Sequence, residues 1–274
     1  MTISRAWSPL LSGDAAAAAL AAVAAIAADL AATASLIAPF GPDPAFSLAR
    51  GTAGQALFLA YLDAAVPERG YGDLGRELLG QAVEVAVARP GAAAFPTGVS
   101  GVAWTVEHLW GRRCTDVAGE EPWDGEALDL AWRACDHGRV EGLVDAGLRH
   151  GLAGRAHRLN RLFQATGKEP FADAARAGFG RLLAMRRPGE GIGGFQARVS
   201  GVDGRPVWAD DPGLLDGSAG IGLALLAAVS AVEPAWDRLL LAWLQPRRAP
   251  LAAPSHPGMA FAETAPGAVS FRPA

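Results

Sequence analysis

The sequence is poor in the residues that stabilise small secreted folds or attract polyanions. It has 2 cysteines, Cys114 and Cys135, in 274 residues, too few for a disulfide framework. Lys and Arg number 24 against 28 Asp and Glu, so the net charge of −4 offers no electrostatic basis for binding nucleic acid or an anionic membrane. We therefore expect reduced thiols in a cytoplasmic protein that has no nucleic-acid partner.

Strand-like segments and tyrosines are also scarce, whereas small apolar residues are abundant. Apolar residues make up 51% of the chain, with 10 Phe and 2 Tyr, and many of the rest are alanine. Alanine has the highest helix propensity. The longest Ala-rich run, 15–36, is preceded by Asp14 and interrupted by Asp29, and no cluster of positive charge precedes it. We interpret it as a soluble first helix and expect no membrane insertion.

Glycine turns of the form Gly-x-x-Gly recur along the chain, roughly every 50 residues, and each opens an Ala/Leu-rich run. Such a recurrence is typical of repeat architectures. The glycine pair is expected to let the chain turn sharply and to leave backbone N–H groups free for an anion or polar substrate. The four turns are Gly51–Gly54, Gly98–Gly101, Gly151–Gly154 and Gly217–Gly220.

Apolar periodicity predicts alternating inner and outer helices around these turns. Between them, Pro188 to Pro212 is a long glycine-rich loop with an extended stretch from Phe195 to Val199. Helical hairpins arrayed in this way predict an all-α toroid over 1–245, and the proline-rich segment 246–274 predicts a disordered tail. The predicted helices are 15–37, 56–66, 74–87, 102–110, 126–135, 156–166, 171–185, 221–231 and 234–244.

Several separated motifs occur in an order that resembles one family. They are Ser47–Gly54, Pro96–Trp104, Asp145–Gly154 followed by Asn160–Gly167, and Leu214–Ile221 followed by Pro234–Leu241. They resemble the repeats of the lanthionine synthetase C-like (LanC-like) proteins. The resemblance implies an α/α toroid acting in lanthipeptide biosynthesis on a peptide substrate, or with a peptide-modifying partner enzyme. In that family a Zn²⁺ ion, held by two cysteines and a histidine, activates a peptide cysteine thiol. The thiol adds to a dehydrated Ser or Thr, and a separate histidine and aspartate assist with protons.

The chain departs from this pattern at the metal site. Arg149 occupies the first position of the Cys-His-Gly motif, and no Trp-Cys-x-Gly occurs. Between Gly101 and Gly151 there is room for one hairpin, so we expect an incomplete or open ring of about four turns. His150 is then the one residue that maps onto a family zinc ligand. The same stretch, Gly147 to Gly151, also fits the motif of the family's acid/base histidine, so His150 stays open between a metal and a catalytic role.

An arginine cannot ligate zinc, because it stays protonated and has no lone pair. Its charge also opposes a dication. Cys114 or Cys135 would have to complete the site. Cys135-Asp136-His137 is either such a contributor or a solvated helix end. The other candidate substrate contacts at the turns are Arg149, Gly151, Gly154, Asp216 and Gly217.

Further interpretations concern single aspartate, histidine and tryptophan residues. Asp216 is either a helix cap or a substrate contact, and His157 either bonds a carbonyl while partly buried or faces the turn. His108 and His256 are interpreted as ordinary positions. The tryptophans are interpreted as core anchors, namely Trp104, Trp110, Trp132 and Trp236.

The leading hypothesis is a LanC-like relative of the lanthipeptide thioether cyclases whose zinc-assisted chemistry is impaired by Arg149. The alternative is a non-catalytic helical module that binds a peptide or a partner enzyme. A third reading is a remnant that cannot close its ring and self-associates through exposed apolar edges.

Overall fold

The computed structural model describes residues 6–33, 45–88, 97–109, 145–200 and 205–240. Within these ranges helices dominate, which confirms the all-α prediction at the level of fold class. The helices are α1 (Gly13–Thr33), α2 (Thr52–Ala65), α3 (Tyr71–Ala88), α4 (Val99–Leu109), α6 (Leu152–Thr166), α7 (Glu169–Ala184), α8 (Ser218–Val229) and the 3₁₀-helix η2 (Ala235–Leu240).

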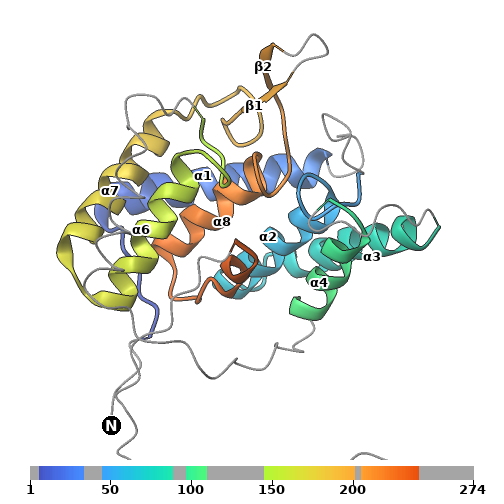
Figure 1. Ribbon diagram of the computed structural model, residues 1–274, viewed down its shortest axis with the longest axis horizontal. Coiled ribbons are helices and arrows are strands. Elements are labelled where there is room, and N and C mark those ends of the chain that lie inside the picture. The colour runs from blue at the N-terminus through green and yellow to red at the C-terminus, as the bar shows by residue number, and fades with distance from the viewer. Residues whose placement is uncertain (1–5, 34–44, 89–96, 110–144, 201–204, 241–274) are drawn as a thin grey trace, which may run out of the picture.

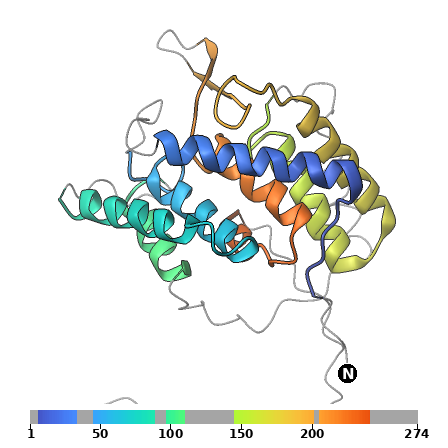
Figure 2. The same cartoon turned by 180° about the vertical axis from the view of Figure 1, so that it is seen from behind.

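Helical hairpins flank a central helix. The pairs α2–α3 and α6–α7 pack most closely, and α8 contacts α1, α2 and α6. Figure 1 shows α8 between α6 on one side and α2 on the other, and Figure 2 shows α1 crossing the back of α8. Residues Ser218 to Ala228 of α8 are all buried as a result. Closure of these hairpins into a toroid stays a prediction, since 110–144 lie outside the described residues.

The helices begin closer to the glycine turns than apolar periodicity indicated. The starts of α2, α6 and α8 were predicted at 56, 156 and 221. Each helix in fact begins directly after the first glycine of its turn, which is its N-cap. The apolar stripe is set by packing against other helices, whereas the first helical turn is set by backbone bonds of the preceding loop. The periodicity therefore missed the opening residues.

The same backbone loop precedes all three of these helices. The N–H of the first helical residue donates to the carbonyl at the start of the loop, from Thr52 to Ala45, Leu152 to Asp145 and Ser218 to Asp211. Before α6 the next two N–H groups are bonded as well, because Ala153 donates to Ala146 and Gly154 to Gly147. The prediction that these N–H groups stay free for an anion is therefore wrong where the loop binds them.

The three turns are hydrogen-bonded to one another in series. The N–H groups of Leu148 and Arg149 both donate to the carbonyl of Leu215, at 2.9 and 2.8 Å. Those of Leu214 and Leu215 both donate to the carbonyl of Ala49, at 2.8 and 3.0 Å. The α8 turn is thus bonded to the α6 turn and to the α2 turn, and equivalent positions of the three turns are brought side by side.

The glycines of the turns are required by close approach. Gly51, Gly151 and Gly217 have φ angles of −107°, −93° and −101°, which any residue can adopt, so their backbone angles do not require glycine. A Cβ on the second glycine would instead collide with a carbonyl oxygen of its own loop, that of Leu148 for Gly154 and that of Leu214 for Gly220. Glycine is therefore needed at the second position of Gly-x-x-Gly because each loop packs directly against the first turn of its helix.

Helix α1 is long and apolar enough, over Gly13–Ala32, to cross a membrane by length and composition. In this structure one of its faces is buried, and α1 packs on α8. The predicted helix over 15–37 is confirmed up to Thr33, and its predicted end lies outside the described residues. The buried positions are Ala19, Ala22, Val23, Ile26, Ala27 and Leu30.

The long loop between α7 and α8 carries a small hairpin. Strand β1 (Ala197–Ser200) pairs antiparallel with β2 (Pro206–Ala209), so the extended stretch predicted from Phe195 is confirmed in part, while β2 was not predicted. The last predicted helix, over 234–244, corresponds to the 3₁₀-helix η2 up to Leu240, and its predicted end lies outside the described residues. The helix predicted over 126–135 and the tail over 246–274 lie outside the described residues.

Candidate functional site

The candidate site is the polar surface formed where the three turns meet. The position before the first glycine carries a different polar residue in each turn, Arg50, His150 and Asp216. With their neighbours they form what we name the turn cluster, which comprises Arg50, Asp145, Arg149, His150, Asp211 and Asp216. The serial hydrogen bonds between the turns bring these residues together although they are separated by up to 166 positions of sequence.

The outer part of the turn cluster holds Arg149, His150 and Asp216. Arg149 Nη2 lies 3.5 Å from Asp216 Oδ2, with the two side chains 42% and 19% exposed. His150 is exposed. Burial raises the pKa of the nearby Asp145, and the charge of Asp216 raises it further. The hydrogen bond from the Gly147 N–H and the charge interaction with His150 act in the opposite direction. This part of the cluster therefore presents a cation and an imidazole to solvent, with the half-buried carboxylates of Asp216 and Asp145 beside them.

The inner part is an ion pair between two turns. Arg50 donates from Nε and Nη2 to Asp211 Oδ2, at 3.0 and 2.5 Å, and the other oxygen of Asp211 accepts the N–H of Gly213 at 2.7 Å. Burial raises the pKa of Asp211, and Asp216 adds to the shift, against the Gly213 N–H and Arg50. The sequence analysis did not identify Asp211 as a site residue. Its equivalence to Asp145, which occupies the same position of the loop before α6, could have indicated it.

The other predicted site residues take structural places. Gly151, Gly154 and Gly217 are buried against backbone atoms of their own loops. The interpretation of Asp216 as a helix cap is wrong, because the N-cap of α8 is Gly217 and no side chain caps it. The carboxylate of Asp216 is turned toward Arg149 instead.

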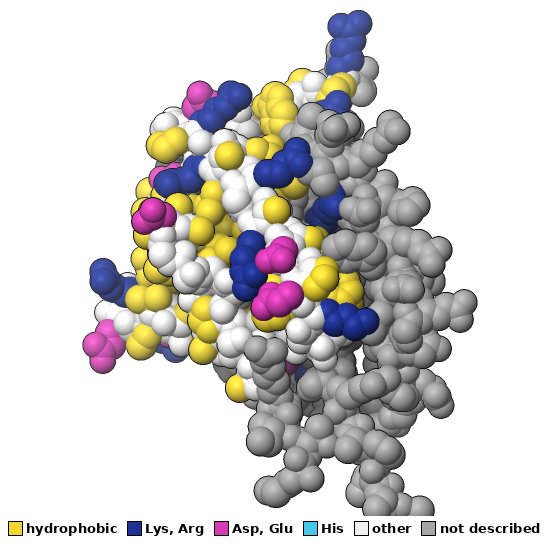
Figure 3. All heavy atoms as spheres, turned by 90° about the vertical axis from the view of Figure 1, so that its left-hand side faces the viewer, with side chains coloured by type: hydrophobic (Ala, Val, Ile, Leu, Met, Phe, Trp, Pro, Cys, Tyr) yellow, Lys and Arg dark blue, Asp and Glu magenta, His cyan; other side chains and the backbone are white. Residues whose placement is uncertain are grey.

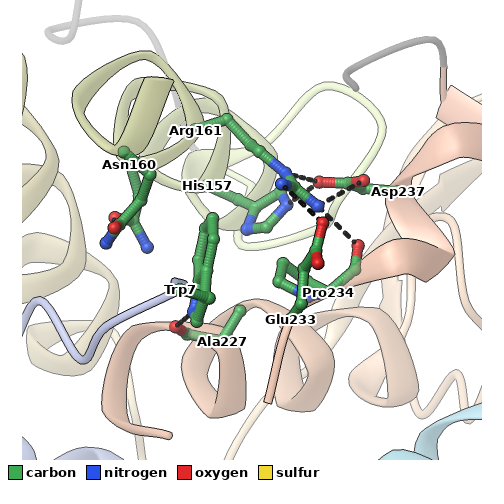
Figure 4. Close-up of polar contacts among 9 residues, drawn as sticks. Trp7, His157, Asn160, Arg161, Ala227, Glu233, Pro234 and Asp237 are labelled. Atoms are coloured by element: carbon green, nitrogen blue, oxygen red, sulfur yellow. Dashed lines mark hydrogen bonds and ion pairs between the residues drawn. The ribbon is translucent and has the colours of Figure 1, made fainter. Parts of the chain in front are cut away.

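A second polar cluster lies buried beneath α6, and Figure 4 shows it. His157 Nε2 donates to Asp237 Oδ2 at 2.8 Å, and Arg161 donates to both oxygens of Asp237 at 2.5 and 3.0 Å. Arg161 also donates to the carbonyl of Pro234 at 3.1 Å. Of the two alternatives for His157, a partly buried ring bonded to a carbonyl or a ring facing the turn, the structure is nearer to the first, but the partner is a carboxylate. We call His157, Arg161 and Asp237 the buried triad.

Aromatic rings enclose the buried triad. The His157 ring stacks on Trp236 at a centroid distance of 4.7 Å, and the guanidinium of Arg161 lies 4.7 Å from the centre of the Trp7 ring. Burial alone would raise the pKa of Asp237, but its bonds to His157 and Arg161 lower it below the usual value. The side chains of His157 and Asp237 are 1% and 0% exposed, so the triad ties η2 to α6 away from any ligand.

A third polar contact links α2 to α4. Tyr61 Oη and His108 Nε2 are 2.9 Å apart, and the His108 ring stacks on Trp104 at 4.6 Å. Burial raises the pKa of Tyr61, and the charge of Asp237 raises it further. His108 is thus a packed interhelical contact, which no local pattern in the sequence indicated. Trp236 is buried in the core as predicted, Trp104 is half-buried, and Trp110, Trp132 and His256 lie outside the described residues.

The turn cluster does not fit the zinc site of the resemblance. Within the described ranges, no three His, Cys, Asp or Glu side chains are grouped so as to hold a metal ion. The cation that stands next to His150 is Arg149, which is paired with Asp216. Cys114, Cys135 and His137 fall in 110–144, outside the described residues. We therefore derive no chemical step through zinc from these residues.

What the turn cluster can do is bind groups of both signs. A guanidinium recognises carboxylates and carbonyl oxygens, and carboxylates accept hydrogen bonds from N–H groups or ammonium ions.

The resemblance to LanC-like proteins rests on the motifs quoted above and on the glycine turns that they form. No protein-family model matches the chain, and no curated protein matches it either.

Proposed function

We propose that the chain is a LanC-like protein that holds a peptide against the turn cluster, and that its capacity for zinc-assisted thiol addition is impaired. The observation that carries the proposal is the pair formed by exposed Arg149 and half-buried Asp216, beside exposed His150. In the LanC-like proteins that the chain resembles, a cysteine that ligates zinc occupies the position of Arg149. Here it supplies a fixed positive charge, which suits binding of a peptide better than binding of a metal.

The Arg149–Asp216 pair is suited to open for a ligand. Arg149 is exposed and its Nη2 lies 3.5 Å from Asp216 Oδ2, so the pair is screened by water on one side and contributes on the order of 1 kcal/mol to stability. Arg149 can then contact a peptide carbonyl or carboxylate, and Asp216 can accept a backbone N–H. Beneath them the Arg50–Asp211 pair is buried and holds the α2 and α8 turns in place. The surface therefore offers a weak ion pair that can exchange partners, supported by a stronger pair beneath it.

The alternative is that the chain is an active cyclase. It would require two cysteine ligands beside His150, and Cys114 and Cys135 are the two that the sequence contains. The reaction would then be addition of a peptide thiol across the double bond of a dehydrated Ser or Thr, as the family resemblance implies. Zinc content and product formation separate this alternative from binding alone.

The test uses a linear peptide that contains one cysteine and one dehydroalanine. We expect calorimetric binding that persists in EDTA, weakens in Arg149→Ala and Asp216→Asn, and is unchanged in Arg176→Ala, an exposed ion-paired arginine on α7. Elemental analysis of wild type and His150→Ala is run in parallel. Near-stoichiometric zinc that disappears in His150→Ala, together with thioether formation, would establish the cyclase instead. Absence of binding by wild type would overturn the proposal.

A further inference from the structure

A cavity of about 480 Å³ opens beside the turn that carries His150. Its walls come from two parts of the chain: the loop before α6 with the first residue of α6, and the continuous stretch formed by the end of α7, the loop that follows it and β2. We call it the α7–β2 pocket. Its volume is within the range of sites that bind small molecules or peptide side chains. It is lined by Ala146, Leu152, Arg181, Ala184, Met185, Arg187, Glu190, Gly194, Phe195, Gln196 and Trp208.

The inner surface of the pocket is apolar. Leu152 and Phe195 are buried and form part of its wall, and Met185 is half-buried. Trp208 completes the wall from β2 while 52% of it stays exposed. A half-exposed tryptophan over a concave apolar surface is the kind of residue that dominates binding energy, because a ligand buries the remaining ring surface. The pocket therefore favours a ligand with an apolar group.

The rim of the pocket is positively charged. The charged residues of the lining are two arginines, Arg181 and Arg187, and one carboxylate, Glu190. Arg187 Nη1 and Glu190 Oε2 are 3.6 Å apart with both side chains exposed, so their mutual attraction is weak. Figure 3, which views the molecule from the left-hand side of Figure 1, shows Lys and Arg side chains beside hydrophobic ones in its upper part. A ligand that carries a negative charge beside its apolar group would match the rim.

The loop that forms the pocket is held firmly in place. Gly193 donates its N–H to Asp29 on α1 at 2.7 Å, and its carbonyl accepts from Arg186 at 2.8 Å. Ser218 at the start of α8 donates to the carbonyl of Ile192 at 3.0 Å. Gly194 has a φ angle of 93°, which favours glycine. A site preformed in this way loses little entropy when it binds a ligand.

We propose that the α7–β2 pocket anchors a peptide through an aromatic or large aliphatic side chain that is flanked by Asp or Glu. The apolar group contacts Trp208 and Phe195, and the flanking carboxylate faces the arginines of the rim. Since Ala146 and Leu152 belong to the same turn as His150, a peptide anchored here passes along the turn cluster. This inference rests on the proposed function and adds the class of peptide.

The probe is a fluorescein-labelled peptide, Gly-Ser-Glu-Phe-Glu-Ser-Gly, with two counterparts in which Lys replaces both Glu or Ser replaces Phe. Fluorescence anisotropy measures its affinity for wild type, Trp208→Ala and Arg187→Glu. Val207→Ala, the preceding position on β2, and Arg176→Glu, another exposed arginine paired with a carboxylate, are the matched controls. We expect losses of at least about tenfold for Trp208→Ala and Arg187→Glu, and unchanged affinity for the controls.

The two counterpart peptides are expected to bind wild type at least about tenfold more weakly, and the affinity of the acidic peptide is expected to fall with added salt. Equal affinity across all five proteins, or no binding to wild type, would overturn the inference. Arg149→Ala and Asp216→Asn are titrated with the same peptide. Loss in these two with normal binding by Trp208→Ala overturns the pocket and leaves the proposed function standing. The reverse pattern supports the pocket and contradicts the turn cluster.

Discussion

Two clusters of the same residue types, one at the turn before α6 and one on the body of α6, have opposite environments. The turn cluster places His150 near Arg149 and Asp216 at the surface, and the buried triad places His157 with Arg161 and Asp237 in the interior. The ion pair of the surface cluster spans 3.5 Å, whereas the bonds of the triad are 2.5–3.0 Å. Chemical identity alone would give both clusters the same role.

Burial decides between stability and binding. In water, separated partners recover most of their interaction from solvent, so an exposed pair contributes little and can exchange its partner for a ligand. In the interior, removal of one partner strands the others without water, so the buried triad is costly to disturb. We therefore assign the buried triad to the attachment of η2 and the turn cluster to ligand binding. Substitutions that are matched between the two clusters test this contrast.

The largest effect is expected for Asp237→Asn. The change leaves the guanidinium of Arg161 buried without its counter-charge, which should cost about 3–5 kcal/mol of unfolding free energy. Asp216→Asn, the matched change in the turn cluster, should cost less than about 1 kcal/mol. Urea denaturation of both variants gives the comparison. Similar losses in the two would remove the distinction between the clusters.

The effect of Asp237 should also depend on pH. Its pKa in the folded protein is lowered, so its stabilisation is present above the unfolded value, near 4, and is lost as pH falls through the folded value. The difference in stability between wild type and Asp237→Asn should therefore shrink below about pH 4. A difference that stays constant down to the lowest pH at which both fold would contradict this account.

An intermediate effect is expected for the two histidines. His157→Ala removes a ring that stacks on Trp236 and bonds Asp237, and should cost about 2–4 kcal/mol through lost packing and a lost hydrogen bond. His150→Ala removes an exposed ring and should change stability by less than about 0.5 kcal/mol. Thermal and urea unfolding measure both. A larger loss at His150 would place it in the folding core and remove it from the candidate site.

The contrast between the histidines also marks what could be predicted from the sequence. The glycine turns were predicted, because the need for glycine arises within one loop, between Gly154 and the Leu148 carbonyl. Their recurrence also placed Arg50, His150 and Asp216 at equivalent positions. The partner of His157 lies 80 residues away in η2, and nothing local indicates a contact over that separation.

Other misses have related causes. The Tyr61–His108 contact joins two helices whose relative placement depends on how whole hairpins pack, which periodicity does not give. Free N–H groups were expected at the turns because helix starts commonly leave them, but the loops bend back far enough to bind them. Strand β2 is largely exposed, so it lacks the alternating pattern of a half-buried strand.

The smallest effect is expected at Asp145 in the turn cluster. Burial is the main cause of its raised pKa, and the charge of Asp216 adds to it. Asp216→Asn removes that charge and should move the pKa of Asp145 downward, with that of Asp211 moving in the same direction. Carboxyl carbon chemical shifts followed by NMR across the acid range measure both groups.

The sign of this shift also affects stability. A carboxyl group whose pKa is raised in the folded protein contributes stability that is present below its unfolded pKa and lost as pH rises through the folded value. Asp216→Asn should reduce that loss at Asp145, so the contribution of Asp145 to the free energy of unfolding should fall less between acid and neutral pH in the variant than in wild type. Arg198→Gln is the matched change of opposite sign, because Arg198 lowers the pKa of Asp145. If neither variant moves the pKa of Asp145, the charges of the turn cluster are too well screened by water to act on a bound peptide together, and each contact would have to be treated as independent.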